Sequence, residues 1–302
     1  MAVDSVITPR DEALRGHLAM LAFSALIAGS FSLGGMVANE IAPAALNSVR
    51  FFIASVLIGS LSLIIAKPSR ADFTAPWRYA VLGTLFATYF VLMFEGLKTA
   101  PPVSSAAMFT LTPAMSAVFG YLILRQITTP RMALALSIGG AGALWVIFRA
   151  DLGALMAFEI GTGESIFFWG CVAHAIYPTV ARGLSRGEHY LTYTFGMLVA
   201  GFIALTAWGW SDIWATDWSG LRPLVWVTIG YTSVFAGATT FTLLQFASLR
   251  LPSAKVMAYT YLTPTWVILW EVALGHGAPS GLILLGVALT VVALALLLKN
   301  EH

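Results

Sequence analysis

Long apolar runs separated by short polar connections fill this 302-residue chain almost from end to end. A membrane-spanning α-helix needs about 20 consecutive, mostly apolar residues. Such runs occur ten times, at residues 17–37, 43–66, 77–97, 102–124, 130–149, 165–184, 190–210, 222–249, 253–274 and 279–298. The pattern predicts an all-α integral membrane protein with ten transmembrane helices.

Basic residues divide unevenly between the two sets of connections that ten spans would create. With the N-terminus in the cytoplasm, twelve lysines and arginines fall in cytoplasmic segments and three in external ones. Cytoplasmic loops of membrane proteins carry an excess of these residues. We therefore expect both chain termini in the cytoplasm and a multi-pass protein embedded in a lipid bilayer.

A short motif occurs twice at a fixed separation. Leu-Thr-Pro stands at residues 111–113 and again at 262–264, which is 151 positions later. The upstream Pro101 recurs as Pro252 with the same separation. Duplicated apolar halves of this kind are typical of secondary transporters, in which the substrate site lies where the repeats meet.

The separation divides the ten spans into two sets of five, within residues 1–150 and 151–302. Because five is an odd number, the second half must enter the membrane from the opposite side. The prediction is therefore two inverted five-helix repeats with a shared site near the middle of the bilayer. Pro101 and Pro252 precede matching spans, so we expect them to act as hinges.

Composition agrees with a membrane protein and argues against several other classes. The chain is 59% hydrophobic and only 10% charged, whereas soluble domains have about 25% charged residues. A net charge of +2 and a single cysteine favour neither nucleic-acid binding nor an intramolecular disulfide. The sequence has no Walker motif, and its five histidines lack the spacing of metal ligands. We predict no cofactor, no metal site, no nucleic-acid partner and no enzymatic activity, and the oligomeric state stays open.

Side chains at helical spacing in the ninth span predict one wall of a path for a small-molecule substrate. The wall consists of residues on one face of this span and their counterparts in the fourth: Tyr259, Thr263, Trp266, Met108, Thr112 and Met115. Such bulky, weakly polar side chains would suit an apolar or aromatic solute, and methionine adapts to different shapes. The alternative is an ordinary contact between helices.

Three further spans place polar or aromatic side chains at membrane depth. The candidates for substrate binding are Tyr89, His174, Tyr177 and Thr242. His174 is the only histidine well inside a span, which favours either contact with a substrate carboxylate or a proton site. The alternative for His174 and for Tyr89 is a hydrogen bond to a neighbouring helix. A membrane-embedded enzyme or sensor would need a polar catalytic cluster at one depth, and only His174 with nearby hydroxyl groups resembles one.

Arg50 is the only basic residue predicted deep inside a span. A buried arginine costs at least about 2.5 kcal/mol on membrane-insertion scales, so it should have a partner. Glu40, Glu95 and Glu271 are candidates, all near the outer ends of their spans. We interpret Arg50 as part of a structural ion pair or as a side chain that snorkels to the membrane interface, and the alternative is an extracellular gate. Glu95 and Glu271 are also the best carboxylates for proton coupling, although both are shallow.

Four local sequences carry a resemblance to a known family that extends over nearly the whole chain. They are Ala28-Gly29-Ser30-Phe31, the stretch 44–54 around Arg50, the two Leu-Thr-Pro motifs, and Gly139-Gly140-Ala141-Gly142. With these motifs the chain resembles the drug/metabolite transporter superfamily, in its EamA-like branch of ten-helix proteins. Within that branch it is similar to the YddG-type amino-acid exporters.

The resemblance implies export of amino acids, including aromatic or hydrophobic ones, and related metabolites across the bacterial inner membrane by alternating access. It also implies a central cavity surrounded by six spans, at residues 17–37, 77–97, 102–124, 165–184, 222–249 and 253–274. The alternative within transport is export of cationic drugs or other metabolites.

Overall fold

The protein is described by a computed structural model that covers residues 9–157 and 159–298. This part of the chain is helical throughout, without a β-strand. The first half contains α1 (Pro9–Val37), α2 (Pro43–Leu61), the π-helix η1 (Ser62–Ala66), the 3₁₀-helix η2 (Arg70–Phe73), α3 (Trp77–Gly96), α4 (Pro102–Phe109), α5 (Thr112–Leu124), α6 (Pro130–Ile147) and α7 (Leu152–Ala157).

The second half repeats this order of helices. It contains α8 (Thr162–Leu184), α9 (Tyr190–Trp208), α10 (Trp210–Ala215), α11 (Pro223–Ser233), the π-helix η3 (Val234–Thr239), α12 (Thr240–Ser248), α13 (Ser253–Ala258), the 3₁₀-helix η4 (Tyr259–Leu262), α14 (Thr263–Ala273) and α15 (Gly281–Leu298).

Eight helical segments of the described chain are long and apolar enough to cross a membrane. The sequence predicts ten, and the two others are α8 and the stretch from α13 to α14. The α8 helix has sufficient length, but polar side chains such as His174 lower its hydropathy. The 3₁₀-helix η4 divides the other stretch into shorter helices. Both nevertheless pack inside the same bundle.

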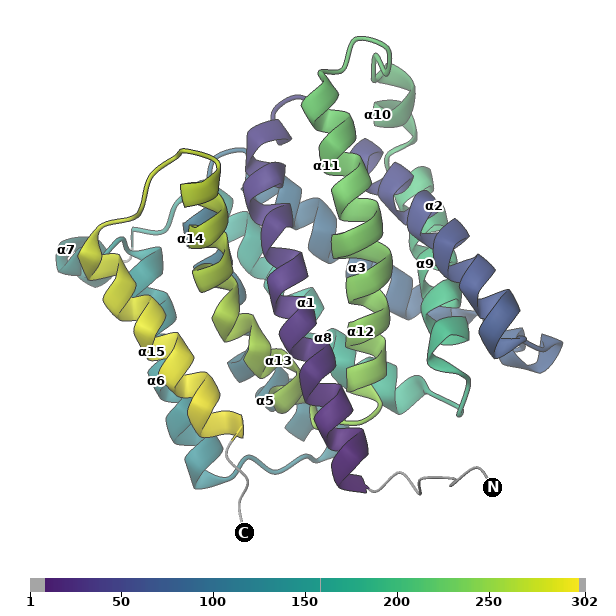
Figure 1. The fold of residues 1–302 in the computed structure, drawn as a ribbon, viewed down its shortest axis with the longest axis horizontal. Helices are drawn as coiled ribbons and strands as arrows, with labels where there is room; N and C mark the ends of the chain where they lie inside the picture. Colours follow the sequence, from purple (N-terminus) through teal and green to yellow (C-terminus); the bar gives the residue numbers. More distant parts are fainter. Residues whose placement is uncertain (1–8, 158, 299–302) are drawn as a thin grey trace, which may run out of the picture.

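The two halves run in opposite directions through the bundle. We call the end where α1 begins and α15 ends the lower end, as drawn in Figure 1. Asn39 after α1 donates to the carbonyl of Lys98 after α3 at 3.2 Å, so these two helices end together at the upper end. Arg78 at the start of α3 donates to the carbonyl of Leu184, the last residue of α8, at 2.8 Å. Thus α8 runs downward, opposite to its counterpart α1.

Helices of one half pack mainly on helices of the other. The α3 helix lies along α8, and the counterpart of α3, formed by α11, η3 and α12, lies along α1. Two further pairs unite counterparts directly, α2 with α9 and α6 with α15, and α3 also packs on α9. This exchange is what an inverted repeat produces when both halves share one core.

Both Leu-Thr-Pro motifs coincide with interruptions of their spans. Proline lacks the N–H group that continues a helix, so the backbone changes course before it. The interruption separates α4 from α5 before Pro113 and forms η4 before Pro264. Thr112 and Thr260 join the two interruptions through a hydroxyl–hydroxyl contact of 3.1 Å. Pro101 and Pro252, the predicted hinges, instead immediately precede the first residues of α4 and α13.

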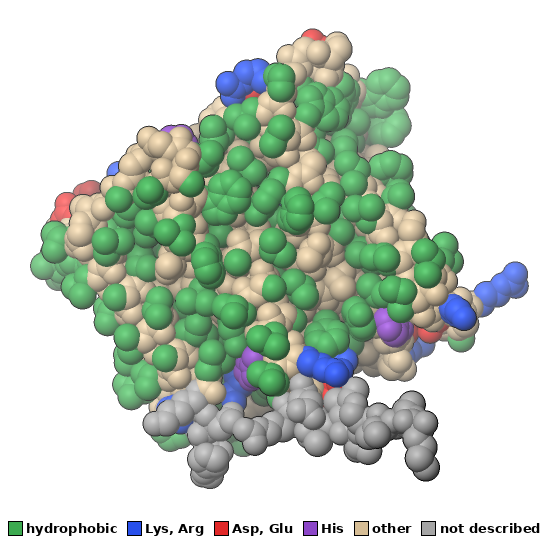
Figure 2. Space-filling model, in the orientation of Figure 1, with side chains coloured by type: hydrophobic (Ala, Val, Ile, Leu, Met, Phe, Trp, Pro, Cys, Tyr) green, Lys and Arg blue, Asp and Glu red, His purple; other side chains and the backbone are tan. Residues whose placement is uncertain are grey.

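Apolar and charged side chains occupy different zones of the surface, as expected for a protein that spans a bilayer. Hydrophobic side chains cover the flank of the molecule in Figure 2, whereas the charged side chains on this face gather near its upper and lower ends. Exposed large apolar residues on the flank include Leu63, Val118, Ile203 and Leu285. Such extensive apolar exposure suits contact with lipid tails.

Candidate substrate site

Seven ring-bearing side chains form a buried cluster where the two halves meet. This central cluster consists of Phe86, Tyr89 and Phe90 on α3, Phe109 on α4, His174 and Tyr177 on α8, and Phe241 on α12. Each of the seven is at most 1% exposed. The positions on α3 share one face because they are separated by three and four residues.

His174 and Tyr177 are held within the central cluster by ring contacts. The imidazole centroid of His174 lies 4.4 Å from the ring of Tyr89 and 4.9 Å from the ring of Phe109. The ring of Tyr177 lies 4.3 Å from that of Phe86, and its hydroxyl donates to Oε1 of Gln245 at 2.7 Å. The structure therefore brings together the predicted candidates Tyr89, His174 and Tyr177.

Arg50 reaches this cluster from α2. Its guanidinium lies over the ring of Phe90, 3.6 Å from the ring centroid, and it donates to the carbonyl of Ala236 within η3. A second bond runs to Oδ1 of Asn47, one turn earlier on α2, at 3.4 Å. The accepting carbonyl of Ala236 therefore lies inside a π-helical segment, a distortion that often occurs at functional sites.

The expected carboxylate partners of Arg50 pair elsewhere, so that prediction is wrong. Glu40 binds Arg222, with 2.7 Å between the carboxylate and Nε, and Glu95 binds Lys98 at 2.7 Å. Glu271 lies 2.8 Å from Nδ1 of His276. All three carboxylates lie at helix ends, where a partner is close in sequence or in a facing loop. Arg50 instead lies at a depth that these short side chains do not reach.

Several polar atoms in and beside the central cluster are buried without a hydrogen-bond partner among the described residues. They are Nε of Arg50, the hydroxyl of Tyr89, Nδ1 of His174 and Nε2 of Gln245. Leaving a buried polar group unsatisfied costs roughly 1–3 kcal/mol, so native proteins rarely retain it without a reason. In a transporter core, a solute that completes these hydrogen bonds is such a reason.

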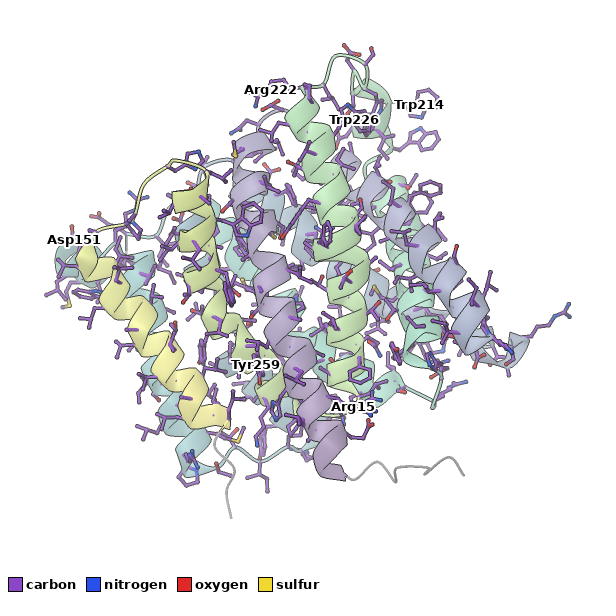
Figure 3. The ribbon with its side chains drawn as sticks, viewed as in Figure 1. Arg15, Asp151, Trp214, Arg222, Trp226 and Tyr259 are labelled. Carbon is purple, nitrogen blue, oxygen red and sulfur yellow. The ribbon has the colours of Figure 1, made fainter. Side chains whose placement is uncertain are left out.

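The predicted wall of the ninth span lies mainly against α1. The Tyr259 ring is 6.0 Å from the ring of His17, and Trp266 Nε1 donates to Oγ of Ser24 at 3.2 Å. Figure 3 shows Tyr259 toward the lower end, far from Arg222 at the upper end. These contacts match the alternative of a helix–helix interface.

The remaining candidates are spread over neighbouring positions. The Met108 side chain is buried and Met115 is half-buried. Thr242 of α12 donates to the carbonyl of Ala238 in the preceding η3, at 2.7 Å. The hydroxyl of Thr263 is buried without a partner in the described part of the chain.

The site also contains residues that were not predicted from the sequence, namely Phe109, Phe241 and Asn47. For Asn47 a signal was present in the sequence, because it lies one helical turn before Arg50.

Hollows open at both ends of the bundle, and the central cluster is closed between them. The lower hollow has a volume of about 550 Å³ and is lined by Gln126, Arg182 and Lys255 among others. An upper hollow of about 510 Å³ is lined by residues that include Arg149 and Glu164. Neither of these two hollows is lined by a residue of the central cluster, whose side chains are buried between them.

Comparison with known proteins agrees with this arrangement. The EamA-like transporter family matches residues 14–148 and 161–299, once in each half. An uncharacterized transporter of Bacillus subtilis (strain 168), YyaM, is 23% identical over 262 residues, which cover 86% of each protein. A solved crystal structure shares 20% identity and a TM-score of 0.71, over 95% of this chain and 96% of the other. That likeness concerns the fold alone.

The family matches cover most of the chain and fall separately on the two halves that the structure places in opposite directions. The apolar flank and the buried polar core are what a membrane transporter requires. The chain belongs to the EamA-like transporter family, within the drug/metabolite transporter superfamily.

Proposed function

We propose that this protein is a secondary transporter that exports amino acids and related small metabolites from the bacterial cytoplasm. Its ten spans form two inverted five-helix repeats, with both termini in the cytoplasm and the lower end facing inward. The observation that carries the proposal is the closed central cluster between two opposed halves, with unsatisfied polar atoms inside an otherwise aromatic core.

Two ion pairs support alternating access as the mechanism. At the lower end, Arg78 of α3 lies 2.5 Å from Glu188, which stands in the loop between α8 and α9. At the upper end, Arg222 before α11 binds Glu40, which stands in the loop between α1 and α2. Each pair joins the start of the third span of one half to the first loop of the other. In the proposed cycle, separating one pair opens one end while the other pair keeps its end closed.

The central cluster supports an aromatic or hydrophobic side chain in the substrate. Phe86, Phe90 and Phe241 offer ring faces and edges, which favour apolar and aromatic groups. Tyr89 and His174 offer polar atoms beside those rings. In the proposed cycle the substrate enters by displacing these ring contacts. The same site then contains either the packed aromatic rings or the bound solute.

Counterflow into proteoliposomes tests the proposal. Vesicles loaded with one unlabelled amino acid are diluted into the same labelled amino acid, across a panel of hydrophobic and aromatic amino acids and at several pH gradients. We expect saturable accumulation of at least one member, absent from protein-free vesicles of the same lipid. Absence of saturable movement for every amino acid would remove the substrate class from the proposal.

Single-cysteine labelling tests the orientation. The native Cys171 is buried, so a membrane-impermeant maleimide should leave the unmodified protein unlabelled. Cysteines introduced at Ser69 and Ser219, in loops at opposite ends, should react from the cytoplasmic and the external side respectively. Labelling of both from one side would contradict the proposed topology.

A further inference from the structure

We propose that Arg50 binds the carboxylate of the transported solute, so that the substrate class is an organic acid or amino acid with a free carboxylate. The inference rests on the proposed transport function and assigns a substrate-binding role to a residue that the sequence suggested as a structural ion pair or gate. The two most deeply buried arginines of the described chain, Arg50 and Arg78, differ in whether a carboxylate pairs with them.

Arg50 and Arg78 are both almost fully buried, at 0% and 1% exposure. Arg78 has the carboxylate of Glu188 at 2.5 Å. Arg50 has a carbonyl, an amide oxygen and an aromatic face, but no carboxylate within ion-pair distance in the described chain. A charge in the interior of a membrane protein is costly unless it is paired. The missing anion is therefore best supplied by the solute.

The atoms around Arg50 suit a carboxylate. Its Nε is buried without a partner in the described residues, and so is the hydroxyl of Tyr89. Phe90 connects them, because Arg50 lies over its ring and the Tyr89 ring is 4.5 Å away from it. The ring of His174 lies beside that of Tyr89, with 4.4 Å between the two ring centroids. Its Nδ1 is also buried without a hydrogen-bond partner in the described residues. Guanidinium and hydroxyl donors bind the two oxygens of a carboxylate well.

The inverted repeat shows that the fold itself does not require this arginine. The α9 helix (Tyr190–Trp208), which is the counterpart of α2, contains no lysine or arginine, so the second half has no equivalent of Arg50 in its matching span. Moreover, η3 departs from α-helical geometry at the place where Ala236 receives Arg50. Such π-segments are often found at functional sites. The charged residue is in the first half alone, and the π-segment that receives it is in the third span of the second half, whereas the matching span α3 is a continuous α-helix.

A structural clamp is the competing explanation, because Arg50 also ties α2 to η3. The two roles differ in what a change at Arg50 does to solutes that lack a carboxylate. A clamp affects transport of every solute alike. A carboxylate site affects only solutes that carry the anion, since the amide of the same acid has no charge to lose.

The test measures counterflow of matched pairs in proteoliposomes, each pair being a hydrophobic or aromatic amino acid and its amide. For the unmodified protein we expect the KM of the acid to be lower than that of the amide by on the order of tenfold or more, as one lost charge-assisted bond implies. Arg50→Gln should raise the KM of the acid to that of the amide and leave the amide unchanged. Arg50→Lys, which keeps the charge, should restore part of the difference.

Arg78→Gln is the matched control, because it removes the other buried arginine. It should alter the maximal rates or the yield of folded protein, while the ratio of acid KM to amide KM is preserved. Equal effects of Arg50→Gln on acid and amide, or unmodified protein that carries amides and organic cations in preference to acids, would overturn the carboxylate site and leave transport intact.

Stabilisation of the detergent-purified protein supplies a second measurement. A solute that binds the folded state raises the melting temperature, so the acids should do so for the unmodified protein and not for Arg50→Gln. Stabilisation by acids without any flux would refute the transport proposal and support the site. If neither flux nor stabilisation by any acid occurs, both proposals fail.

Discussion

The two halves of this protein build the same helix crossing in different ways. Where α3 crosses α9, Gly83 and Gly201 meet, and a Cβ on Gly83 would lie 2.5 Å from the backbone nitrogen of Gly201. The counterpart crossing joins η3 and α2, and there Arg50 donates to the carbonyl of Ala236 within η3. One crossing is made by backbone contact, and the other by a buried cation held against a distorted helix.

The difference separates what the architecture needs from what the function adds. Close approach at small residues is the usual means by which membrane helices associate, and the α3–α9 crossing achieves it without polar atoms. The α2–η3 crossing instead contains a buried charge, which costs stability, beside a π-helical segment. Local violations of good packing are expected where a protein acts rather than where it is merely held together.

The ion pairs at the two ends differ in a comparable way. Arg78 and Glu188 at the lower end have side chains only 2% and 3% exposed. Arg222 and Glu40 at the upper end are 62% and 26% exposed. Water screens the upper ion pair and not the lower one. Although the two pairs occupy equivalent places in the two halves, we expect them to contribute very different amounts to the free energy of unfolding.

The largest effect is expected from removing one partner of the lower pair. Arg78→Met leaves Glu188 buried without its cation, which should cost about 3–5 kcal/mol in the free energy of unfolding. Arg50→Met should cost much less, because no carboxylate is left behind. Thermal unfolding in detergent compares the two variants under identical conditions.

The double variant Arg78→Met with Glu188→Met provides the control for this comparison. Because it removes both charges together, it should recover much of the loss, which a double-mutant cycle measures as coupling. Equal losses for Arg78→Met and Arg50→Met would show that Arg50 has an anionic partner after all.

A smaller effect is expected at the glycine crossing. In Gly83→Ala the new methyl group would meet the Gly201 nitrogen at 2.5 Å and the Met197 carbonyl at 2.7 Å. Backbone atoms cannot move aside as a flexible side chain can, so α3 and α9 must separate, at a cost of about 1–3 kcal/mol. The measurement is again the melting temperature of the purified protein.

Gly230→Ala on α11 is the matched control, since nothing lies within 4 Å of a Cβ at that position. It should leave stability unchanged or raise it slightly, because alanine favours the helix over glycine. A Gly83→Ala variant as stable as Gly230→Ala would mean that the α3–α9 crossing is loosely packed, and the contrast with the α2–η3 crossing would disappear.

The sequence predicted the all-helical membrane fold and the family correctly, because hydropathy and a repeated motif are properties of the chain itself. It also identified Tyr89, His174 and Tyr177, since polar rings at membrane depth are rare enough to be noticed. That they bind substrate stays a prediction. The opposite directions of the two halves followed from counting spans, a step that needs no atomic detail.

The partners of Arg50 could not be predicted in the same way. The prediction of a carboxylate partner used only the depth of each residue along its span. The actual contact depends on η3, where a π-helical turn rotates every later residue around the helix axis. Helical spacing likewise assumed continuous spans, but η4 interrupts the ninth one. The break at η4 precedes Pro264, which is visible in the sequence, whereas η3 contains no proline and leaves little trace in hydrophobic periodicity.

The smallest effect is expected from the upper ion pair. Arg222 donates hydrogen bonds to Glu40, and this holds the pKa of that carboxyl below its ordinary value of 4.5. A lowered pKa in the folded state means that the pair contributes stability above the unfolded pKa and loses it as pH falls through the folded value. The pair should therefore be intact at neutral pH and separate only in acid below pH 4.5.

Glu40→Gln should accordingly shift the melting temperature at pH 7 far less than Glu188→Gln, and any shift should shrink in high salt, which screens exposed charges. Below the folded pKa of Glu40 the variant and the unmodified protein should become equally stable at this site. A Glu40→Gln loss as large as that of Glu188→Gln would show that the upper pair is shielded from water. The two ion pairs would then be equivalent, and exposure would no longer distinguish the two ends of the bundle.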